Sequence, residues 1–367
     1  MKPRICHIST AHSPDDIRIF KKECNSLAEA GYDVHLIAPP KTEVKSEHIS
    51  VHYLSKDRLR FNRMGSGFNE VVQLVDTIKP SVVHLHDPEL LRIVSKFKSR
   101  GIKVVYDAHE DLPQQVSTKS YIPRFLRPVV GVSVNSYMKR QLKKCSAIVA
   151  ATPHIASQLS GIGPIVHTVC NYPIINQTPD VNRPWNRTVC YIGSITESRG
   201  IIQMLDSISY MDDVEFDLVG PFGSNSLEER CRQHPNWEKV RFHGPLYGTE
   251  ASNIMKGASI GLVLLQPFPS YEKALPVKMF EYMNHSLPVL ASDFDLWSSI
   301  LKNANAGVCV DSSSPVEIGR FVNRLLSDQE ELERMGMAGS AAVMETYNWK
   351  SEVNALLKLY QDLNLAR

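Results

Sequence analysis

Histidines and carboxylates gather where two predicted strands of the N-terminal half end. The stretches HLHDPEL and YDAHED follow strands expected over 81–86 and 103–109. Their polar residues are His86, Asp87, His109, Glu110 and Asp111. We expect these side chains to line a cleft, where a histidine can act as acid, base or hydrogen-bond donor, and we expect His84 to point into the core. The spacing fits no standard metal motif, so we expect no metal site.

The first predicted strand, 4–9, is followed by the loop AHSPDDIRIF rather than by a glycine-rich turn. This loop supplies His12, Asp15, Asp16 and Arg18 at a strand-to-helix junction, where a polar ligand can bind. Helix capping by an aspartate of the loop is the simpler alternative. Because no glycine precedes Gly31, the usual dinucleotide fingerprint is missing, which argues against a nicotinamide or flavin enzyme.

Small and basic residues follow a strand of the C-terminal half in YIGSITESRG, residues 191–200. Gly193 and Ser194 let the backbone approach a phosphate, and the helix start that follows favours an anion. Arg199 adds a charge suited to bidentate phosphate contact. An ordinary strand–helix turn containing glycine is the alternative.

The stretch YEKALPVKMFEYMNHSLPVLASDFD, residues 271–295, carries the strongest pattern. Pro276 suits the first turn of a helix, which places Lys278 near the helix N-terminus. Glu281 lies three residues later on the same face and can accept hydrogen bonds from sugar hydroxyls. A surface ion pair between Lys278 and Glu281 is compatible with the same spacing.

Short apolar runs alternate with amphipathic stretches in both halves of the chain, which predicts parallel sheets covered by helices. The expected strands are 4–9, 34–39, 81–86, 103–109, 146–152, 187–193, 214–220, 239–244, 260–267, 287–292 and 306–311. The proline- and asparagine-rich segment 171–185 predicts a linker, and two helices are expected near 315–346 and 350–364. The simplest architecture is α/β, with two doubly wound domains and a ligand cleft beyond the strand ends.

Charge is unevenly distributed along the 367 residues, although the net charge is only +2. Residues 1–183 carry 25 Lys and Arg against 16 Asp and Glu, or +9, and the remainder carries −7. No acidic residue lies between Asp111 and Asp180, so the stretch 112–179 is a candidate for an anionic membrane surface or acceptor, with a chance run on a solvated face as the alternative.

The cysteines and apolar runs bear on cellular location. The seven cysteines are scattered and form no C-x-x-C pair, which fits a reducing compartment. The longest apolar run, IGLVLL at 260–265, is too short to span a bilayer, and the N-terminus does not read as a signal peptide. We therefore expect a cytoplasmic protein, peripheral at the inner face of the membrane if the basic stretch binds lipid.

Taken together, these stretches resemble glycosyltransferase family four, the retaining nucleotide-sugar transferases of GT-B fold. The segment HSPDDIRIFKKECNSLAEAGYDVHLIA is similar to the first βαβ unit of that family. VVYDAHED, YIGSITESRG, ALPVKMFEYMNHSLPV and YNWKSEVNALLKLY follow in the family's order and spacing. The resemblance covers almost the whole chain. It implies two Rossmann-like domains, 1–175 for the acceptor and 186–349 for the nucleotide sugar, and a final helix, 350–367, that packs back on the first domain.

The resemblance also assigns roles to individual residues. His109 stands where the family has its active-site histidine, and Arg199 where it has a basic phosphate-binding residue. Glu281 matches the second acid of the family's Glu-x7-Glu motif, while Lys273, beside Glu272, replaces the first. The remaining donor positions implied are Gly193, Ser194, Gly244, Leu246, Ala274, Leu275, Pro276 and Lys278. For the acceptor we expect His12, Asp16, Arg18, His86, Asp87 and Glu110.

The function expected from this resemblance is retaining transfer of a sugar from a nucleotide-diphosphate sugar to a saccharide or lipid-linked acceptor. Cell-surface polysaccharide or glycolipid synthesis is the expected setting. His109 and Glu281 are the expected catalytic residues, and we expect no metal, no other cofactor and no nucleic-acid partner. A nucleotide-sugar 2-epimerase of the same fold and a non-catalytic nucleotide-sugar-binding protein are the alternatives, the latter because Lys273 stands where an acid is expected.

Overall fold

The computed structural model describes residues 3–55, 66–109, 127–175, 183 and 185–363, and it divides into two compact units. The N-terminal unit comprises Met1–Asn171 with Trp349–Arg367, and the C-terminal unit comprises Tyr172–Asn348. Each unit contains one sheet in which every strand pairing is parallel. The α/β class and the two doubly wound sheets expected from the sequence are confirmed.

The sheet of the N-terminal unit has the order β3-β2-β1-β4-β5-β6-β7. Its strands are β1 (Arg4–Ile8), β2 (Asp33–Ala38), β3 (Ile49–Tyr53), β4 (Val82–Leu85), β5 (Lys103–Ala108), β6 (Ala147–Ala150) and β7 (Ile165–Thr168). The helices of this unit are the wide, π-type η1 (Ile17–Cys24), α1 (Asn25–Glu29), α2 (Ser66–Ile78), the 3-10 helix η3 (Pro88–Ile93), α3 (Val94–Lys98), α5 (Arg127–Leu142), α6 (Pro153–Leu159) and α15 (Trp349–Asp362).

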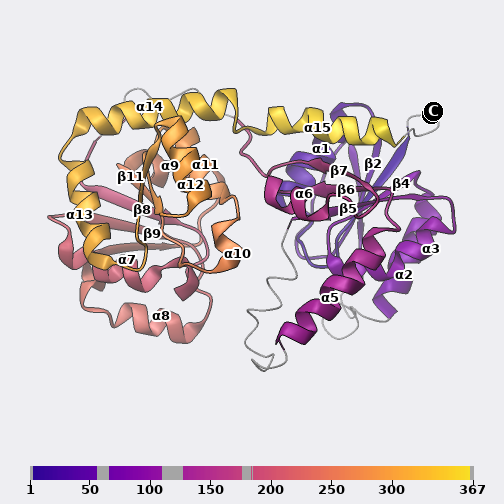
Figure 1. The fold of residues 1–367 in the computed structure, drawn as a ribbon, viewed down its shortest axis with the longest axis horizontal. Helices are drawn as coiled ribbons and strands as arrows, with labels where there is room; N and C mark the ends of the chain where they lie inside the picture. The colour runs from indigo at the N-terminus through magenta and orange to yellow at the C-terminus, as the bar shows by residue number, and fades with distance from the viewer. Residues whose placement is uncertain (1–2, 56–65, 110–126, 176–182, 184, 364–367) are drawn as a thin grey trace. The chain divides into compact units, whose positions relative to one another are not determined.

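Helices cover both faces of this sheet, with α1 and α15 on one side and α2, α3 and α5 on the other in Figure 1. One face is an apolar core in which Val71 and Val75 of α2 and Phe97 of α3 pack on the strands. On the other face α15 is held by side chains. The Trp349 indole donates to Ser26 Oγ at 2.9 Å, and Glu352 accepts the Cys170 amide at 2.6 Å.

The sheet of the C-terminal unit has the order β10-β9-β8-β11-β12-β13. Its strands are β8 (Thr188–Ile192), β9 (Glu215–Val219), β10 (Val240–Gly244), β11 (Ile260–Val263), β12 (Val289–Ser292) and β13 (Gly307–Val310). Its α-helices are α7 (Ile201–Ser207), α8 (Asn225–Arg232), α9 (Gly248–Gly257), α10 (Pro269–Glu272), α11 (Val277–Asn284), α12 (Asp295–Ala304), α13 (Pro315–Leu326) and α14 (Gln329–Glu345), and its 3-10 turns are η4 (Glu197–Arg199), η5 (Ile208–Tyr210) and η6 (Pro235–Lys239).

Two apolar layers sandwich this second sheet. Helices α7, α8 and α13 pack on one face, and α9, α11 and α12 pack on the other (Figure 1). Phe280 of α11 and Trp297 of α12 are fully buried in the second layer. In the N-terminal unit β1 lies between β2 and β4, and in the C-terminal unit β8 lies between β9 and β11, so the chain leaves each of these two strands in one direction and later returns on its other side. That arrangement is the topological switch point at which ligands bind in open α/β sheets.

The sequence interpretation was wrong about the single helix near 315–346 and missed several elements. That region is two helices, because Asp328 begins a new one by accepting the Glu331 amide at 2.9 Å. The edge strands β3 and β7 were missed because most of their residues are half-buried or exposed and neither strand has a continuous apolar run. Helix α5 was missed because it is largely exposed and lacks an apolar stripe.

No described helix is both long enough and apolar enough to cross a membrane.

Candidate functional site

Three glycines end three neighbouring strands of the C-terminal unit. Gly193 follows β8, Gly220 follows β9 and Gly244 ends β10, and all three have a positive φ. Their backbones are hydrogen-bonded, since the Gly193 amide donates to Val219 at 2.8 Å and the Gly220 amide to Gly244 at 2.8 Å. A Cβ atom on Gly220 would collide with the Gly193 carbonyl. The ends of the three strands, at Gly193, Gly220 and Gly244, therefore form a surface of backbone atoms without side chains, here called the glycine shelf.

Two cationic side chains converge on this shelf. A Cβ atom on Gly193 would collide with Cε and Nζ of Lys278 and would lie 3.5 Å from Nη1 of Arg199. Burial and the neighbouring Arg199 charge lower the pKa of Lys278, although Glu281 acts in the opposite direction. Two like charges held together at a strand end are unfavourable alone, and a bound anion would relieve their repulsion.

Lys278 lies in the first turn of α11. Pro276 is the N-cap residue, and it provides no side-chain cap hydrogen bond. Lys278 is the second residue of the helix and Glu281 lies one turn further along. The amides of the first turn therefore add to the positive potential around the Lys278 ammonium. The turn before the helix is fixed by the Trp297 indole, which donates to the Ala274 carbonyl at 2.7 Å.

The other predicted donor residues lie at the edges of this region. Ser194 is exposed, and its carbonyl accepts the Tyr191 hydroxyl at 2.8 Å. Leu246 and Leu275 are half-buried, and the backbone of Gly244 has open space on its Cβ side. An apolar side chain beside bare backbone can receive a flat base, so the structure leaves the predicted nucleobase position accessible at Gly244.

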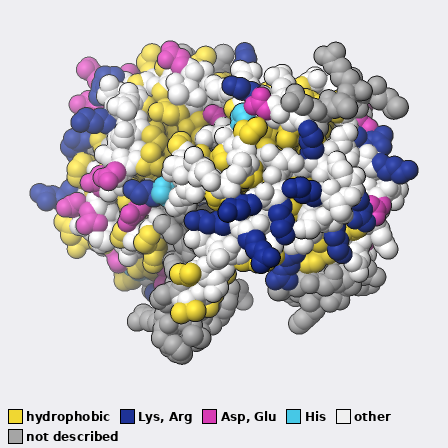
Figure 2. All heavy atoms as spheres, turned by 45° about the vertical axis from the view of Figure 1, so that its right-hand side comes forward, with side chains coloured by type: hydrophobic (Ala, Val, Ile, Leu, Met, Phe, Trp, Pro, Cys, Tyr) yellow, Lys and Arg dark blue, Asp and Glu magenta, His cyan; other side chains and the backbone are white. Residues whose placement is uncertain are grey.

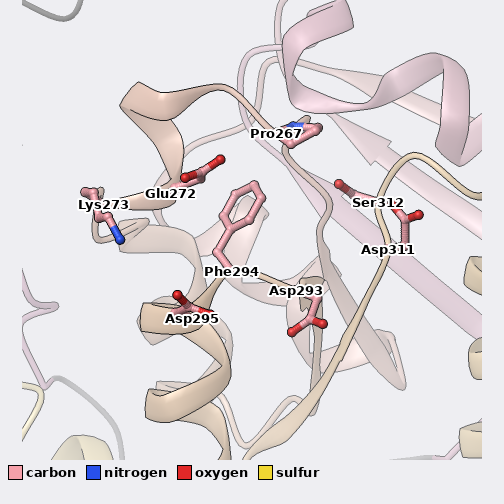
Figure 3. A pocket seen from close by; sticks show the side chains of 8 residues that line it. All are labelled: Pro267, Glu272, Lys273, Asp293, Phe294, Asp295, Asp311 and Ser312. Carbon is pink, nitrogen blue, oxygen red and sulfur yellow. The ribbon is translucent and has the colours of Figure 1, made fainter.

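A cavity of about 330 Å³ lies elsewhere in the C-terminal unit. Figure 3 shows Phe294 in its middle, with Glu272 and Lys273 on one wall and Asp311 and Ser312 on the other. Asp293 and Asp295, from the SDFD sequence, also line it. Lys273, which replaces the expected first acid of the motif, is exposed here. The carboxylates outnumber the one lysine, so this cavity does not suit a diphosphate.

In the N-terminal unit, the polar residues at the strand ends contact each other. Arg18 donates to both carboxylate oxygens of Asp107 at 2.8 Å and to the Val169 carbonyl at 3.1 Å. Although burial opposes ionisation, Arg18, His109 and His86 hold the pKa of Asp107 well below its usual range. His86 Nδ1 lies 3.2 Å and His109 Nδ1 3.6 Å from Asp107 Oδ2. Asp107 thus orients His86 and lies close to His109.

A second ion pair lies at the loop after β1. His12 Nδ1 lies 3.1 Å from Asp87 Oδ1, and Asp87 also accepts the Thr10 amide at 2.6 Å and the Ser9 hydroxyl at 2.9 Å. Burial opposes ionisation of Asp87, but these donors lower its pKa to about 2. The contact with Asp87 raises the pKa of His12.

Burial separates the predicted acceptor residues into two groups. His12, one-third exposed in its side chain, and half-buried Asp16 reach the surface. Asp16 caps η1, with its Oδ1 accepting the Arg18 and Ile19 amides at 2.9 Å, so the capping alternative is confirmed for it. Arg18, His86 and Asp87 are buried against protein partners, and their contact with an acceptor stays a prediction. His84 is fully buried, as expected, and Glu110 lies outside the described residues.

Sequence reasoning missed three residues that organise these sites: Asp107, Glu23 and Gly220. Asp107 and Glu23 are fully buried acids. An aspartate inside the apolar strand sequence KVVYDA was the available signal for Asp107, since a lone acid in a strand needs a partner. Gly220 ends the strand sequence VEFDLVG in the same way that Gly193 ends RTVCYIG, which was the signal for a shared shelf.

Two family models match most of the chain. The one described as "Glycosyltransferase Family 4" matches residues 18–171, and the one described as "Glycosyl transferases group 1" matches residues 180–342. A phosphatidyl-myo-inositol mannosyltransferase from Mycobacterium leprae (strain TN) is 26% identical over 182 residues, 48% of this chain and 46% of that protein. The aligned region spans about half the length of the curated relatives that the chain matches.

Solved structures share the fold over the whole chain. Sucrose-phosphate synthase from Thermosynechococcus elongatus superposes with a TM-score of 0.78 at 15% identity, covering 100% of both chains. Anabaena Alr3699/HepE in complex with UDP-glucose gives 0.72 at 12% identity, covering 98% of this chain and 99% of the other. The two parallel sheets are thus those of the GT-B class of glycosyltransferases. Within that class, the chain belongs to the family-four type.

Proposed function

We propose that this chain transfers a sugar, with retention of configuration, from a nucleotide-diphosphate sugar to a saccharide or lipid-linked acceptor. The proposal rests on one observation: the Lys278 and Arg199 side chains both reach the backbone at Gly193. Cell-surface polysaccharide or glycolipid synthesis is the setting that we propose. A neighbour with the same fold, Anabaena Alr3699/HepE, is described in complex with UDP-glucose, which supports a nucleotide-sugar donor.

The donor diphosphate binds to Arg199, Lys278 and the first-turn amides of α11. As the bond between the sugar and the phosphate breaks, negative charge accumulates on the departing diphosphate. Two fixed cations and a helix N-terminus stabilise that charge without reorganisation. These groups supply the charge stabilisation for which other enzymes use a metal ion, so we propose that the transfer step needs none.

Contacts to the rest of the donor follow from neighbouring positions. Glu281, half-buried and one turn after Lys278, accepts hydrogen bonds from ribose hydroxyls. The turn Ala274-Leu275-Pro276 presents backbone groups to the sugar and phosphate. Gly244 and Leu246 receive the nucleobase. Lys273 stands where the family's first acid is expected, so Glu281 is the acid of that motif that we assign to the donor.

His109 of the N-terminal unit acts on the transferred sugar. Its Nδ1 lies 3.6 Å from Asp107 Oδ2, and its ring makes an edge contact with the His12 ring at a centroid distance of 5.3 Å. An imidazole at this position can hydrogen-bond a sugar hydroxyl more strongly in the transition state than in the ground state. His12 and Asp16 are available to an acceptor, and Asp87 positions His12 through its contact with Nδ1 at 3.1 Å.

A basic and partly apolar surface on α5 supports docking to an anionic membrane. Val129, Val132 and Tyr137 are 64%, 71% and 41% exposed, and Lys139 and Arg140 lie in the last turn of the same helix. Figure 2 shows a face on which Lys and Arg side chains gather with few acids among them. Each cation near such a surface contributes about 1 kcal/mol. Within 112–179, residues 112–126 and 176–179 lie outside the described residues.

Membrane docking is tested by co-sedimentation of the full chain with vesicles. Recovery with anionic vesicles should exceed recovery with neutral ones at low salt, and the excess should disappear at high salt. A double substitution of Lys139 and Arg140 by Ala should reduce it. Equal recovery with both vesicle types would reject electrostatic docking.

Transfer is tested by incubating the full chain with a panel of nucleotide sugars and measuring release of nucleoside diphosphate. Slow release from one donor, accelerated by a saccharide or lipid-linked acceptor, is the expected result. Conversion of a donor to its 2-epimer would instead indicate the epimerase. Tight donor binding without turnover, in the presence of an acceptor panel, would indicate a binding protein.

A further inference from the structure

Three histidines lie together inside the N-terminal unit, on the face of the sheet that η1 and α15 cover. His7 of β1 and His84 of β4 are directly paired in the parallel register, and His86 follows two residues after His84. The ring centroids lie 4.7 Å apart for His7 and His84, 4.8 Å for His84 and His86, and 5.2 Å for His7 and His86. All three side chains are fully buried.

Helix η1 adds a carboxylate to this cluster. Glu23 is fully buried, and its Oε2 lies 3.9 Å from His7 Nδ1 and 3.8 Å from His84 Nδ1. Its other oxygen, Oε1, lies 3.2 Å from Nε of Arg18, so Oε2 is the oxygen that faces the histidines. One ligand atom from each of the four residues can be chosen so that all four atoms lie within 4.8 Å of one another.

Several polar atoms of this cluster lack hydrogen bonds. Among the described residues, Nε2 of His7, Nε2 of His84 and Oε2 of Glu23 have no hydrogen-bond partner, while Oε1 of Glu23 is ion-paired with Arg18. Leaving a buried polar group unpaired costs about 1–3 kcal/mol each, so such groups in a native protein require an explanation. An apolar side chain at any of these positions would avoid that cost.

Groups around the cluster fix two of the rings in the orientation that metal ligands adopt. His86 Nδ1 faces Asp107 Oδ2 at 3.2 Å, and His84 Nδ1 faces the Tyr360 hydroxyl at 2.9 Å. When these oxygens accept the Nδ1 protons, both rings present an Nε2 lone pair. A carboxylate or another oxygen behind the imidazole is the usual arrangement around a ligating histidine.

We propose that His7, Glu23, His84 and His86 bind one Zn²⁺ ion in a closed site inside the N-terminal unit. Three imidazole nitrogens and one carboxylate oxygen are ligands that zinc accepts. Tetrahedral coordination at zinc places ligand atoms about 3.3 Å apart. His7 Nδ1 lies 2.9 Å from His86 Nε2 and 3.9 Å from Glu23 Oε2, and these two distances lie on either side of that value.

The role of this ion is structural. Four protein ligands fill the coordination shell and leave no position for a substrate, unlike a catalytic zinc site. The ion connects β1, β4 and η1, and through Tyr360 it supports the docking of α15. The proposal is independent of sugar transfer.

The test is the zinc content of the full chain, produced in zinc-supplemented medium and dialysed against a weak chelator. We expect about one zinc per chain in the wild type and at least tenfold less in Glu23→Gln and in His84→Gln. His52→Gln is the matched control, because His52 contacts His35 at 2.9 Å in the same unit without belonging to the four-ligand group. This variant should retain its zinc.

A second measurement covers the case in which the variants fail to fold. Wild-type protein loaded with Co²⁺ should show the strong visible absorption of a tetrahedral cobalt centre, and zinc should abolish it. Wild-type protein that holds no zinc and gives no tetrahedral cobalt spectrum would overturn the proposal and leave a hydrogen-bonded histidine cluster. Retention of zinc by folded Glu23→Gln at the wild-type level would also overturn it.

Discussion

The two units have the same kind of sheet, but their strand ends differ. In the N-terminal unit the ends carry charged and polar side chains that are buried and contact each other, as Arg18, Asp107 and His86 do. In the C-terminal unit the corresponding ends are Gly193, Gly220 and Gly244, and the cations come from segments that follow the strands. In the N-terminal unit the buried charges are paired with each other, as Arg18 is with Asp107. In the C-terminal unit Lys278 and Arg199 lie beside backbone without side chains, an arrangement that suits an anionic ligand.

The largest effect on stability should come from removing Arg18, whose charge compensates a buried carboxylate of the N-terminal unit. Arg18→Ala leaves Asp107 buried without its partner and should lower the free energy of unfolding by about 3–5 kcal/mol. Urea denaturation followed by circular dichroism measures this. Arg100→Ala removes the solvent-exposed pair with Asp76 and should leave stability unchanged. Equal stability of both variants would show that Arg18 is not needed to compensate the buried acid.

Adding a methyl group to a glycine of the shelf should destabilise the C-terminal unit most where the new Cβ atom has no room. Gly220→Ala places Cβ against the Gly193 carbonyl and should destabilise the C-terminal unit by about 2–4 kcal/mol. Gly244→Ala meets nothing within 4 Å and carries only backbone strain, about 1 kcal/mol. Thermal denaturation distinguishes the two. The close approach of the strand ends would be doubtful if Gly220→Ala melted like Gly244→Ala.

Turnover should depend on His109 more than folding does. His109→Ala should keep its melting temperature and nucleotide affinity and lose at least about tenfold in turnover, or roughly 1.4 kcal/mol of barrier. His48→Ala changes an exposed histidine of the same unit and serves as the control. Turnover near the wild-type rate, or loss of activity through unfolding alone, would assign His109 a structural role.

The smallest effect concerns the His12–Asp87 pair and depends on pH. The pKa of His12 is raised, so its contribution to stability is complete below about pH 6.5 and is lost as pH rises through the folded-state value. The pKa of Asp87 is about 2, so its contribution is lost only in strong acid. His12→Gln should therefore cost about 1 kcal/mol at pH 5.5, or 2–4 °C in Tm, and less at pH 9. An equal loss at both pH values would contradict this assignment.

The sequence predicted the alternation of strands and helices well, because buried parallel strands are continuous apolar runs such as the one ending at Gly193. It also predicted Lys278 near a helix start, since Pro276 marks one. It could not predict which polar side chains face inward. Arg18 and His86 are far apart in the sequence, and only the packing of η1 against the ends of β4 and β5 brings them together around Asp107. The cluster of His7, Glu23 and His84 depends on long-range packing that the linear spacing does not encode.

The central claim is that Arg199 and Lys278 bind the donor diphosphate, and calorimetric titration with UDP, GDP and ADP tests it most directly. Each Ala variant should bind the preferred nucleotide about ten- to a hundredfold more weakly than the wild type, because each charge-assisted phosphate contact contributes about 1.5–3 kcal/mol. Arg232→Ala, which removes an arginine paired with Glu228 on α8, should bind normally. A double Arg199→Ala, Lys278→Ala variant with wild-type affinity would contradict the account.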